Sequence, residues 1–429
     1  MLEPLYTADE VRAAEQGHDV DELMERAGRA VAQEAMRRFP RARTFELVAG
    51  GGANGGDGRI AARVLQEAGR EVGDSGDVII DALFGTGFHG EPRADAAAEI
   101  ERINGSGVPV LAVDIPSGVD ASTGEVPGSA VRATVTVTFH GRKVGHAVAP
   151  GLFHCGELVV ADIGLEHVDT KNRFVTEDIL RLVPRKRLED NKYTAGSVLV
   201  VGGQRGMTGA VILAASAAFR ADAGYVAVAA PADSLSTIET QLVEAVKRPL
   251  EEAVDATKRA SALALGPGLG RGPDRKALVR ALLESNVPAV VDADALHELE
   301  PFDRDVATVL TPHSGELGRL IGEESSWVDA HRLEALRRAV ERYDCVVLLK
   351  GADTVIGAPG EGVWVVGGAV SALATAGTGD VLTGIIAAFL SKGLAAREAA
   401  AAATVLHRRA ARSRERGLVA RDIVDALWS

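Results

Sequence analysis

The sequence contains very little cysteine and few aromatic residues. Only two of its 429 residues are cysteines, Cys155 and Cys345, and aromatic residues make up 4%. Two cysteines cannot form the disulfide framework that stabilises small secreted domains. Because Cys345 precedes the apolar run 346–349, a buried and unreactive thiol is its simplest interpretation. The chain is therefore expected to fold around aliphatic side chains in a reducing compartment.

The sequence also lacks a targeting signal, a membrane span and an excess of positive charge. Residues 1–12 are acidic and have neither the basic start nor the apolar centre of a secretory signal. No apolar run approaches the roughly 20 residues of a membrane span. The formal net charge of -13 disfavours nucleic-acid binding through phosphate neutralisation. We expect a cytoplasmic protein whose partners are small molecules, not nucleic acids or membranes.

Glycine and small aliphatic residues are what the sequence has in abundance. Hydrophobic residues account for 46% of the chain, and 48 residues are glycines, which is typical of compact α/β domains. A chain of this length predicts two or three domains. A polar stretch at residues 166–173 separates two series of strands. The sequence thus predicts two α/β domains, residues 1–168 and 174–429.

The stretch Ala376–Asp380 has the pattern of a phosphate-transfer centre. Ala-Gly-Thr-Gly-Asp precedes an apolar segment with the spacing of a buried helix. Because N–H groups at a helix N-terminus attract anions, Gly377, Thr378 and Gly379 can form an anion hole. Asp380 would be the base that removes a proton from an attacking hydroxyl. The alternative is a glycine-rich turn that Asp380 merely caps.

The first half of the chain alternates strands and glycine loops, as a doubly wound sheet does. Each of three predicted strands, 45–49, 77–84 and 108–113, runs directly into a loop that contains glycine. Ligands collect at the carboxyl ends of parallel strands. Lys143 follows a further strand and can face the same pocket, although a solvated lysine is the simpler interpretation. Four oxygen-bearing side chains at the strand ends can hold a hard cation: Asn54, Asp81, Asp114 and Ser117.

Three motifs, Asn54–Gly58, Asp81–Gly87 and Asp114–Gly118, resemble those of the NAD(P)H-hydrate epimerases, over about residues 1–165. The resemblance implies a Rossmann-like three-layer α/β/α domain that interconverts the R and S hydrates of NADH and NADPH. It implies potassium ligands at Asn54, Asp81 and Ser117 and makes Asp114 the candidate for epimerase catalysis. The substrate-binding residues that it implies are Ala53, Asn54, Gly55, Gly56, Asp57, Gly85, Thr86, Gly87, Phe88, His89, Gly90, Glu91 and Asp114.

Two departures separate this chain from that pattern. Ala53 stands where the family has a second asparagine. Only residues 69–76 lie between the first predicted helix and the strand at Asp77, where the family fits a further strand and helix, and so short a segment cannot supply both. The sheet is therefore expected to lack a strand. A non-catalytic binding scaffold, like the related domains of RNA-decapping proteins, stays an alternative for the first half.

The second half carries another series of motifs at predicted strand ends. In chain order they are Gly206–Ala210, Gly266–Gly270, Asp292–Leu296, Thr311–His313, Lys350–Thr354 and Ala376–Asp380. This series resembles the ribokinase-like fold and, within it, the ADP-dependent NAD(P)H-hydrate dehydratases, over about residues 175–429. The resemblance implies hydrate contacts at Ala210, Gly268, His313 and Asp380. The implied nucleotide contacts are Lys350, Gly351, Ala352, Asp353, Thr354 and Gly379.

The two resemblances together imply an enzyme that repairs hydrated NADH and NADPH. The first half would be an isomerase that epimerises the R and S hydrates, and the second half a lyase that dehydrates the S form while ADP becomes AMP and phosphate. The implied cofactors are ADP or ATP as phosphoryl donor, Mg²⁺, for which Glu316 is a candidate ligand, and K⁺. A homo-oligomer is also expected. The alternative is a ribokinase-like vitamin or sugar kinase with a non-catalytic N-terminal binding domain.

The last helical segment, residues 395–416, is rich in alanine and arginine. Its arginines, Arg408 among them, are expected on a solvated face and not at a nucleic-acid site.

Overall fold

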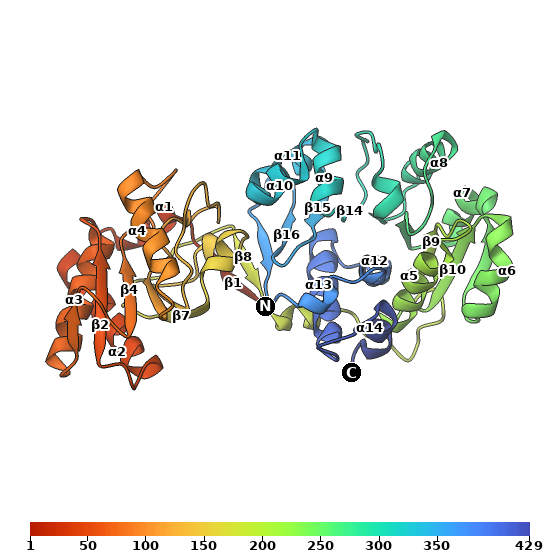
Figure 1. Cartoon of the computed structure of the whole chain (residues 1–429). Coiled ribbons are helices and arrows are strands. Elements are labelled where there is room, and N and C mark those ends of the chain that lie inside the picture. The colour runs from red at the N-terminus through yellow and green to blue at the C-terminus, as the bar shows by residue number, and fades with distance from the viewer. The chain divides into compact units, whose positions relative to one another are not determined.

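A computed structural model describes the whole chain, residues 1–429, as two compact units (Figure 1). The N-terminal unit comprises Pro4–Phe174 with Asp329–His331. The C-terminal unit comprises Val175–Val328 and Arg332–Ser429 with the first three residues, Met1–Glu3. Each unit is built of helices around a largely parallel sheet, so the predicted class of two α/β domains is confirmed. None of the helices has both the length and the apolarity that crossing a bilayer requires.

The N-terminal unit has helices on both faces of a six-stranded parallel sheet. Along the sheet the strands follow the order β3 (Glu71–Gly73), β2 (Thr44–Ala49), β4 (Val78–Ala82), β5 (Val110–Val113), β6 (Val135–Phe139) and β7 (Glu157–Ala161), and the helices are α1 (Ala8–Glu15), α2 (Val20–Arg38), α3 (Ala53–Glu67) and α4 (Ala94–Gly105). Successive residues of a strand face opposite sides of its sheet. In β4, Val78 and Ile80 pack with α2 and α3, whereas Ile79 packs with α4. The unit therefore has the predicted three layers.

The shortened stretch before β4 keeps its strand and lacks only the helix, so the expected loss of a strand is wrong. β3 pairs with one edge of β2 and β4 with the other, and both meet β2 near its start: Gly73 lies opposite Glu46, and Val78 opposite Phe45. The connection therefore only has to cross β2, a distance of about two strand spacings. Gly76 makes this crossing possible, because a Cβ there would lie 2.5 Å from the backbone nitrogen of Glu46.

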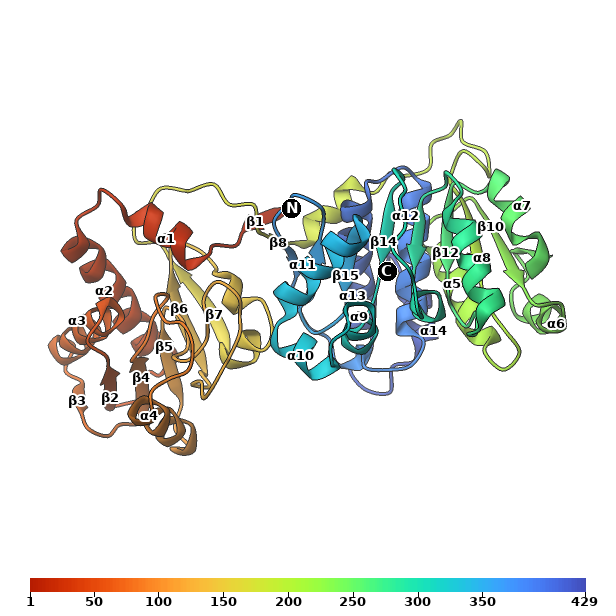
Figure 2. The same cartoon turned by 90° about the horizontal axis from the view of Figure 1, so that it is seen from above.

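The C-terminal unit is organised on a longer sheet, whose strands follow the order β1-β8-β17-β16-β15-β14-β13-β12-β9-β10-β11. Strands β9 to β15 pair parallel with one another, whereas β16 pairs antiparallel with both β15 and β17. Figure 2 shows these strands from above. Their bounds are β1 (Leu2–Pro4), β8 (Arg173–Val175), β9 (Ser197–Val201), β10 (Tyr225–Ala230), β11 (Val246–Pro249), β12 (Ala262–Leu265), β13 (Ala289–Val291), β14 (Thr308–Leu310), β15 (Val346–Leu349), β16 (Thr354–Gly357) and β17 (Trp364–Val366).

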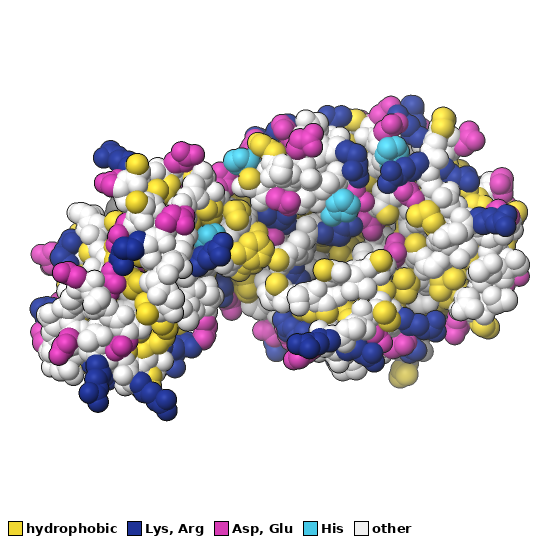
Figure 3. Space-filling model, in the orientation of Figure 1, with side chains coloured by type: hydrophobic (Ala, Val, Ile, Leu, Met, Phe, Trp, Pro, Cys, Tyr) yellow, Lys and Arg dark blue, Asp and Glu magenta, His cyan; other side chains and the backbone are white.

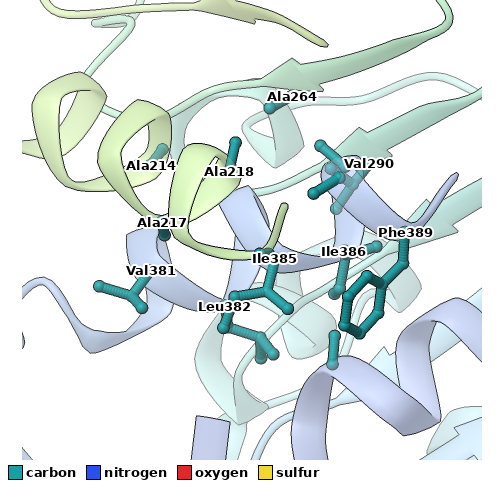
Figure 4. Close-up of a cluster of buried hydrophobic side chains, with 14 of the residues drawn as sticks. Ala214, Ala217, Ala218, Ala264, Val290, Val381, Leu382, Ile385, Ile386 and Phe389 are labelled. Atoms are coloured by element: carbon teal, nitrogen blue, oxygen red, sulfur yellow. The ribbon is translucent and has the colours of Figure 1, made fainter. Parts of the chain in front are cut away.

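Helix α12 lies at the centre of this unit. The helices are α5 (Thr208–Arg220), α6 (Ala232–Gln241), α7 (Ala253–Ala256), α8 (Pro273–Leu283), α9 (Ser314–Ile321), α10 (Ser325–Ala330), α11 (Arg332–Tyr343), α12 (Thr378–Ser391), α13 (Ala396–Ala411) and α14 (Ala420–Ala426). Figure 4 shows Val381, Ile385 and Phe389 of α12 among the alanines of α5 and residues of the sheet. At Gly384 a Cβ would lie 2.0 Å from the carbonyl oxygen of Ala214, so the two helices touch through their backbones. This packing fixes where α12 begins.

Candidate active sites

The N-terminus of α12 presents a carboxylate beside exposed backbone N–H groups. Gly377 precedes the helix with φ 87°, a left-handed conformation that favours glycine, and a Cβ there would lie 2.8 Å from Leu213 Cδ1. The Thr378 hydroxyl donates hydrogen bonds to the carbonyls of Leu373 and Thr375, both at 3.0 Å, and so ties the preceding loop to the helix. The first N–H groups of a helix have no intrahelical acceptor. The geometry is therefore that of an anion site with Asp380 in its first turn.

A partly buried ion pair lies next to this turn. Lys350, at the end of β15, donates to Asp292 Oδ1 at 2.8 Å, and Asp292 follows β13. Thr383, one turn into α12, donates to Asp292 Oδ2 at 2.7 Å. A Cβ at Gly379 would lie 3.6 Å from Lys350 Nζ. The pair therefore lies in the same site as Gly377–Gly379, which we call the anion loop. The ends of β13 and β15 and the first turns of α12 meet there.

The charges of this site set the protonation of Asp380. Burial, followed by the negative charge of Asp292, raises the pKa of Asp380 to about 7, while Lys350 acts against them. Burial by itself would lower the pKa of Lys350, but Asp292, Glu316 and Asp380 outweigh it, and that pKa is raised. Lys350 is therefore a cation at neutral pH. Asp380 has a pKa suited to a general base near pH 7.

The predicted hydrate contacts lie on neighbouring elements. Ala210 is in the first turn of α5, and Gly268 follows β12; a Cβ at Gly268 would lie 3.3 Å from Ala210 Cβ. His313 is the N-cap of α9, where its Nδ1 accepts from the N–H of Gly315 at 3.0 Å. Glu316 closes the capping box by accepting from the N–H of His313 at 2.9 Å. The capping interpretation of His313 thus describes its Nδ1, and its Nε2 lies 3.5 Å from Glu316 Oε2.

The predicted nucleotide loop, residues 350–354, is held from behind by two arginines. Asp353 is 1% exposed and pairs with Arg332, with Nε and Oδ2 2.9 Å apart. Arg408 of α13 is 4% exposed and donates to the carbonyls of Gly351 and Ala352, so its expected place on a solvated face is wrong. The helix turns this arginine inward, because α13 is packed on the sheet over most of its length. Asp353 is buried as a whole residue and therefore supports the loop from within.

Asp114 is the centre of the corresponding site in the N-terminal unit. It follows β5 with φ 65°, an uncommon conformation for a residue with a side chain. Lys143 donates to Asp114 Oδ1 at 2.6 Å and to Thr138 Oγ1 at 2.7 Å, and Thr138 donates to the same Asp114 oxygen at 2.9 Å. Lys143 is fully buried, so the simpler expectation of a solvated lysine is wrong. Burial alone would raise the pKa of Asp114, but Lys143 outweighs it, and the pKa is lowered.

His146 supports this pair without carrying charge. Its Nδ1 accepts from the N–H of Lys143 at 3.0 Å, which leaves the proton on Nε2, 2.8 Å from the carbonyl oxygen of Asp114. Burial, and then the nearby Lys143 charge, lowers the pKa of His146 to about 3. The neutral ring therefore holds the backbone of both Lys143 and Asp114.

The candidate potassium residues meet at one backbone segment. Asn54 Nδ2 donates to the carbonyl oxygen of Phe84 at 2.8 Å, and the N–H of Phe84 donates to Ser117 Oγ at 2.8 Å. Ser117 Oγ in turn donates to Asp81 Oδ1 at 2.6 Å. Burial raises the pKa of Asp81 to about 6, and the groups that act against it are the neutral donors of Ser117 and Leu83. A fully buried carboxylate with oxygen neighbours and no cationic partner fits a hard monovalent cation.

The predicted substrate loops lie beside the Asp114 site and the candidate potassium residues. A Cβ at Gly85 would lie 2.9 Å from Asn54 Cβ, so loop 85–91 packs on the start of α3. In that loop the rings of Phe84 and Phe88 stack with centroids 4.6 Å apart, and His89 Nδ1 lies 2.8 Å from Asp120 Oδ2. The remaining predicted loop residues lie here as well: Ala53, Gly55, Gly56, Thr86, Gly87, Gly90 and Glu91. None of them forms a side-chain hydrogen bond to Asp114, Thr138 or Lys143.

Asp57 lies in the first turns of α3 and is buried. Burial, and then the charges of Asp114 and Glu15, raises the pKa of Asp57 to about 8, with Lys143 acting against them. Asp57 is therefore protonated at neutral pH while Asp114 is ionised. The electrostatic coupling places Glu15, Asp57, Asp114 and Lys143 in one site.

Five residues of these sites were missed or undervalued by sequence reasoning: Thr138, Lys143, His146, Asp292 and Thr383. Asp292 had a usable signal, since it is the first polar residue after a buried strand. The position of Lys143 shortly after a strand gave a weaker signal. Thr138, His146 and Thr383 had none, because a lone threonine or histidine within an apolar pattern carries no information on its partner.

Comparison with known proteins adds a family to this geometry. The NAD(P)H-hydrate dehydratase family model matches residues 198–423, and the family described as YjeF-related protein N-terminus matches residues 20–73 and 73–145. The bifunctional NAD(P)H-hydrate repair enzyme Nnr of Coxiella burnetii is 35% identical to this chain, covering 96% of it and 95% of the relative. That of Escherichia coli is 32% identical, covering 99% and 93%.

The chain belongs to the bifunctional NAD(P)H-hydrate repair enzymes.

Membership in the repair enzymes confirms the predicted family and its two enzyme classes, isomerase and lyase. A solved structure, the ADP/ATP-dependent NAD(P)H-hydrate dehydratase of Bacillus subtilis co-crystallised with ATP and Mg²⁺, is 30% identical with a TM-score of 0.56, covering 59% of this chain and 95% of that one. The two segments of the N-terminal family match meet at Gly73, where this repair enzyme lacks the helix between β3 and β4.

Proposed function

We propose that residues 174–429 dehydrate the S hydrate of NADH or NADPH with Asp380 as the base. The observation that carries this is the pKa of Asp380, about 7, at the start of a helix and beside Lys350. Asp380 takes the proton of the ring hydroxyl, whose oxygen attacks the terminal phosphorus of ADP while the bond to AMP breaks. Phosphate then leaves the ring with the electron pair of its C–O bond, and the neighbouring ring carbon loses a proton. The products are NAD(P)H, AMP and phosphate.

The anion loop and Lys350 supply the positive potential for this transfer. The N–H groups at Gly377, Thr378 and Gly379 and the Lys350 ammonium can hold the charge on the transferring phosphoryl oxygens. The hydrate would lie against Ala210, Gly268 and His313, and the nucleotide against residues 350–354. On the face shown in Figure 3 the C-terminal unit is hollowed, with charged side chains of both signs around the hollow.

Mg²⁺ would enter with the nucleotide. The chain contains no cluster of three or more His, Cys, Asp or Glu side chains that could hold a metal ion. Mg²⁺ usually takes one or two carboxylates together with phosphate oxygens. Glu316 lies 3.8 Å from Lys350 and is the carboxylate that we assign to it, directly or through water. When bound, the ion neutralises charge on the phosphates.

We propose further that residues 1–168 epimerise the hydrates by acid–base chemistry. The hydroxyl carbon inverts when the hydroxyl leaves as water and water adds to the opposite face. Asp57, protonated at neutral pH, can donate the proton that the leaving hydroxyl needs, and Asp114, ionised beside Lys143, can accept one from the incoming water. Asn54, Asp81 and Ser117 would hold K⁺, whose charge would balance the buried Asp81.

Purified enzyme supplied with only the R hydrate, with and without ADP, tests both proposals. With ADP, the absorbance of the dihydronicotinamide ring should return fully; without ADP, R and S hydrate should equilibrate faster than they do spontaneously. A stable phosphorylated product would instead support the vitamin or sugar kinase. Dehydration of the S hydrate alone, with no conversion of R, would support a non-catalytic N-terminal scaffold. We expect a cytoplasmic homo-oligomer, and light scattering of the purified chain tests the oligomeric state.

A further inference from the structure

Arg408 is hydrogen-bonded to the predicted nucleotide loop. Its Nη2 donates to the carbonyl oxygens of Gly351 and Ala352, both at 3.0 Å, and to Thr354 Oγ1 at 2.8 Å. The side chain comes from α13, which is far from the loop in sequence. One guanidinium therefore fixes three residues of the segment that joins β15 and β16.

The same side chain also fixes the end of β17. Its Nη1 donates to the carbonyl oxygen of Gly367 at 2.7 Å and to that of Val366. A guanidinium carries five N–H donors in one plane and no acceptor, so it can hold several carbonyls at once. A lysine ammonium has three donors that do not form such a fork. Arg408 thus joins the nucleotide loop to the strand that leads toward the anion loop.

Peptide geometry predicts the direction in which the N–H groups of the loop point. In a trans peptide the C=O and N–H groups point in opposite directions. The carbonyl of Gly351 shares its peptide with the N–H of Ala352, and the carbonyl of Ala352 shares its peptide with the N–H of Asp353. Since both carbonyls point at Arg408, both N–H groups point away from it. Only Ala352 is partly exposed, whereas Asp353 is 1% exposed, so the N–H that can meet a ligand is that of Ala352. It is a donor of the kind that cradles phosphate oxygens.

The charges behind the loop have the sign that attracts a nucleotide. The groups that act on Arg408 are Asp353, Arg412 and Arg332, which is one carboxylate against two further guanidiniums. Burial lowers the pKa of Arg408 to about 10, so it is still a cation at neutral pH. Arg332 and Asp353 neutralise each other as a buried pair. Arg408 therefore adds positive charge beneath the loop, which Asp353 offsets in part.

We propose that Arg408 is a positioning residue for ADP: by drawing the carbonyls of residues 351 and 352 inward, it fixes the loop and turns the N–H of Ala352 toward the nucleotide phosphates. The inference rests on the proposed function, because it takes residues 350–354 as the nucleotide site. It gives α13, which touches neither substrate, a part in nucleotide affinity. It also assigns a task to an arginine that the sequence pattern places on a solvated face.

The test is a pair of variants, Arg408→Met and Arg408→Lys, with Arg409→Met as matched control. Arg409 is on the same helix, but its guanidinium lies over the ring of Trp428, 5.8 Å from the centroid. Arg408→Met should raise the Kd for ADP by at least about tenfold, since a charged hydrogen-bond donor is removed from several carbonyls. Turnover at saturating ADP and epimerisation should change by less than about threefold. The Kd of Arg408→Lys for ADP should lie between those of wild type and Arg408→Met, and the Kd of the control should match wild type.

Three results would overturn the proposal. The first is an Arg408→Met variant that melts at a lower temperature but keeps the wild-type Kd and KM for ADP, because the role would then be structural only. The second is an Arg408→Lys variant equal to wild type, because charge without the fork would then suffice. The third is wild-type enzyme that binds no ADP, which would also overturn the proposed function; the first two leave that function standing. If Arg408→Met does not fold, Arg408→Lys carries the test.

Discussion

Replacing Asp380 with asparagine should have opposite effects on activity and on stability. The variant keeps the shape of the side chain but loses the base, so dehydration of the S hydrate should slow by about 10²- to 10⁴-fold. Stability should rise, because the native structure buries a carboxylate next to Asp292, which raises the pKa of Asp380 to about 7 from its ordinary value of 3.8.

The size of the stability effect follows from this shift. One pKa unit corresponds to about 1.4 kcal/mol, so a rise of about three units corresponds to at most about 4 kcal/mol. The folded-state pKa is raised, so at pH values below about 4 the group is protonated in both states and the penalty is absent. The penalty grows between pH 4 and 7, where the unfolded chain is ionised and the folded one is not. Above pH 7 it is complete.

Thermal unfolding at pH 5 and pH 8.5 measures this effect, and recovery of dihydronicotinamide absorbance from the S hydrate measures activity. Asp380→Asn should melt several degrees above wild type at pH 8.5, with a smaller gain at pH 5. The exposed Asp305→Asn in the same unit is the control and should change neither quantity. Equal or lower stability of Asp380→Asn at pH 8.5 would refute the electrostatic reasoning. Dehydration within tenfold of wild type would refute the assignment of the base.

Three further predictions concern the other parts of the two sites. Lys143→Met should lose epimerisation and about 3–5 kcal/mol of unfolding free energy, because Asp114 stays buried and unpaired; equilibrium denaturation should show part of the loss restored by adding Asp114→Asn. Gly377→Ala should slow dehydration at least tenfold more than Gly393→Ala does. Gly393 has a similar positive φ but no neighbour within 4 Å, and the steady-state rates of both variants test the prediction. Potassium should raise the melting temperature of wild type above that in lithium at equal ionic strength, and an equal gain in Asp81→Asn would contradict the proposed ion site.

Much of the fold and the residues of both candidate sites could be proposed from the sequence, because their signals are local. A glycine that must adopt a positive φ, an aspartate just after it and an apolar helix pattern stand together at Gly377, Asp380 and Val381. The oxygen-bearing residues of the first half likewise stand directly after apolar runs. A parallel sheet brings its strand ends to one edge, so position in the pattern is enough to predict convergence.

The tertiary structure decided which side chains are partners and which are buried. Lys143 and Arg408 have the local sequence of solvated residues, yet each is enclosed by elements that the chain reaches only after further turns. The missing strand was a wrong prediction for the same reason. Whether Glu71–Gly73 can be a strand depends on β2 beside it, and whether so short a connection suffices depends on Gly76 passing over that strand.

The sequence by itself thus determined the order of the elements, the family and the groups that we propose for the chemistry, since each depends on a few adjacent residues. The tertiary structure alone determined the protonation of Asp380, Asp57 and Asp114. A pKa depends on burial and on charges contributed by distant parts of the chain. In Asp380 those charges are Asp292 and Lys350, from two other strand ends, and no spacing in the sequence shows that they meet.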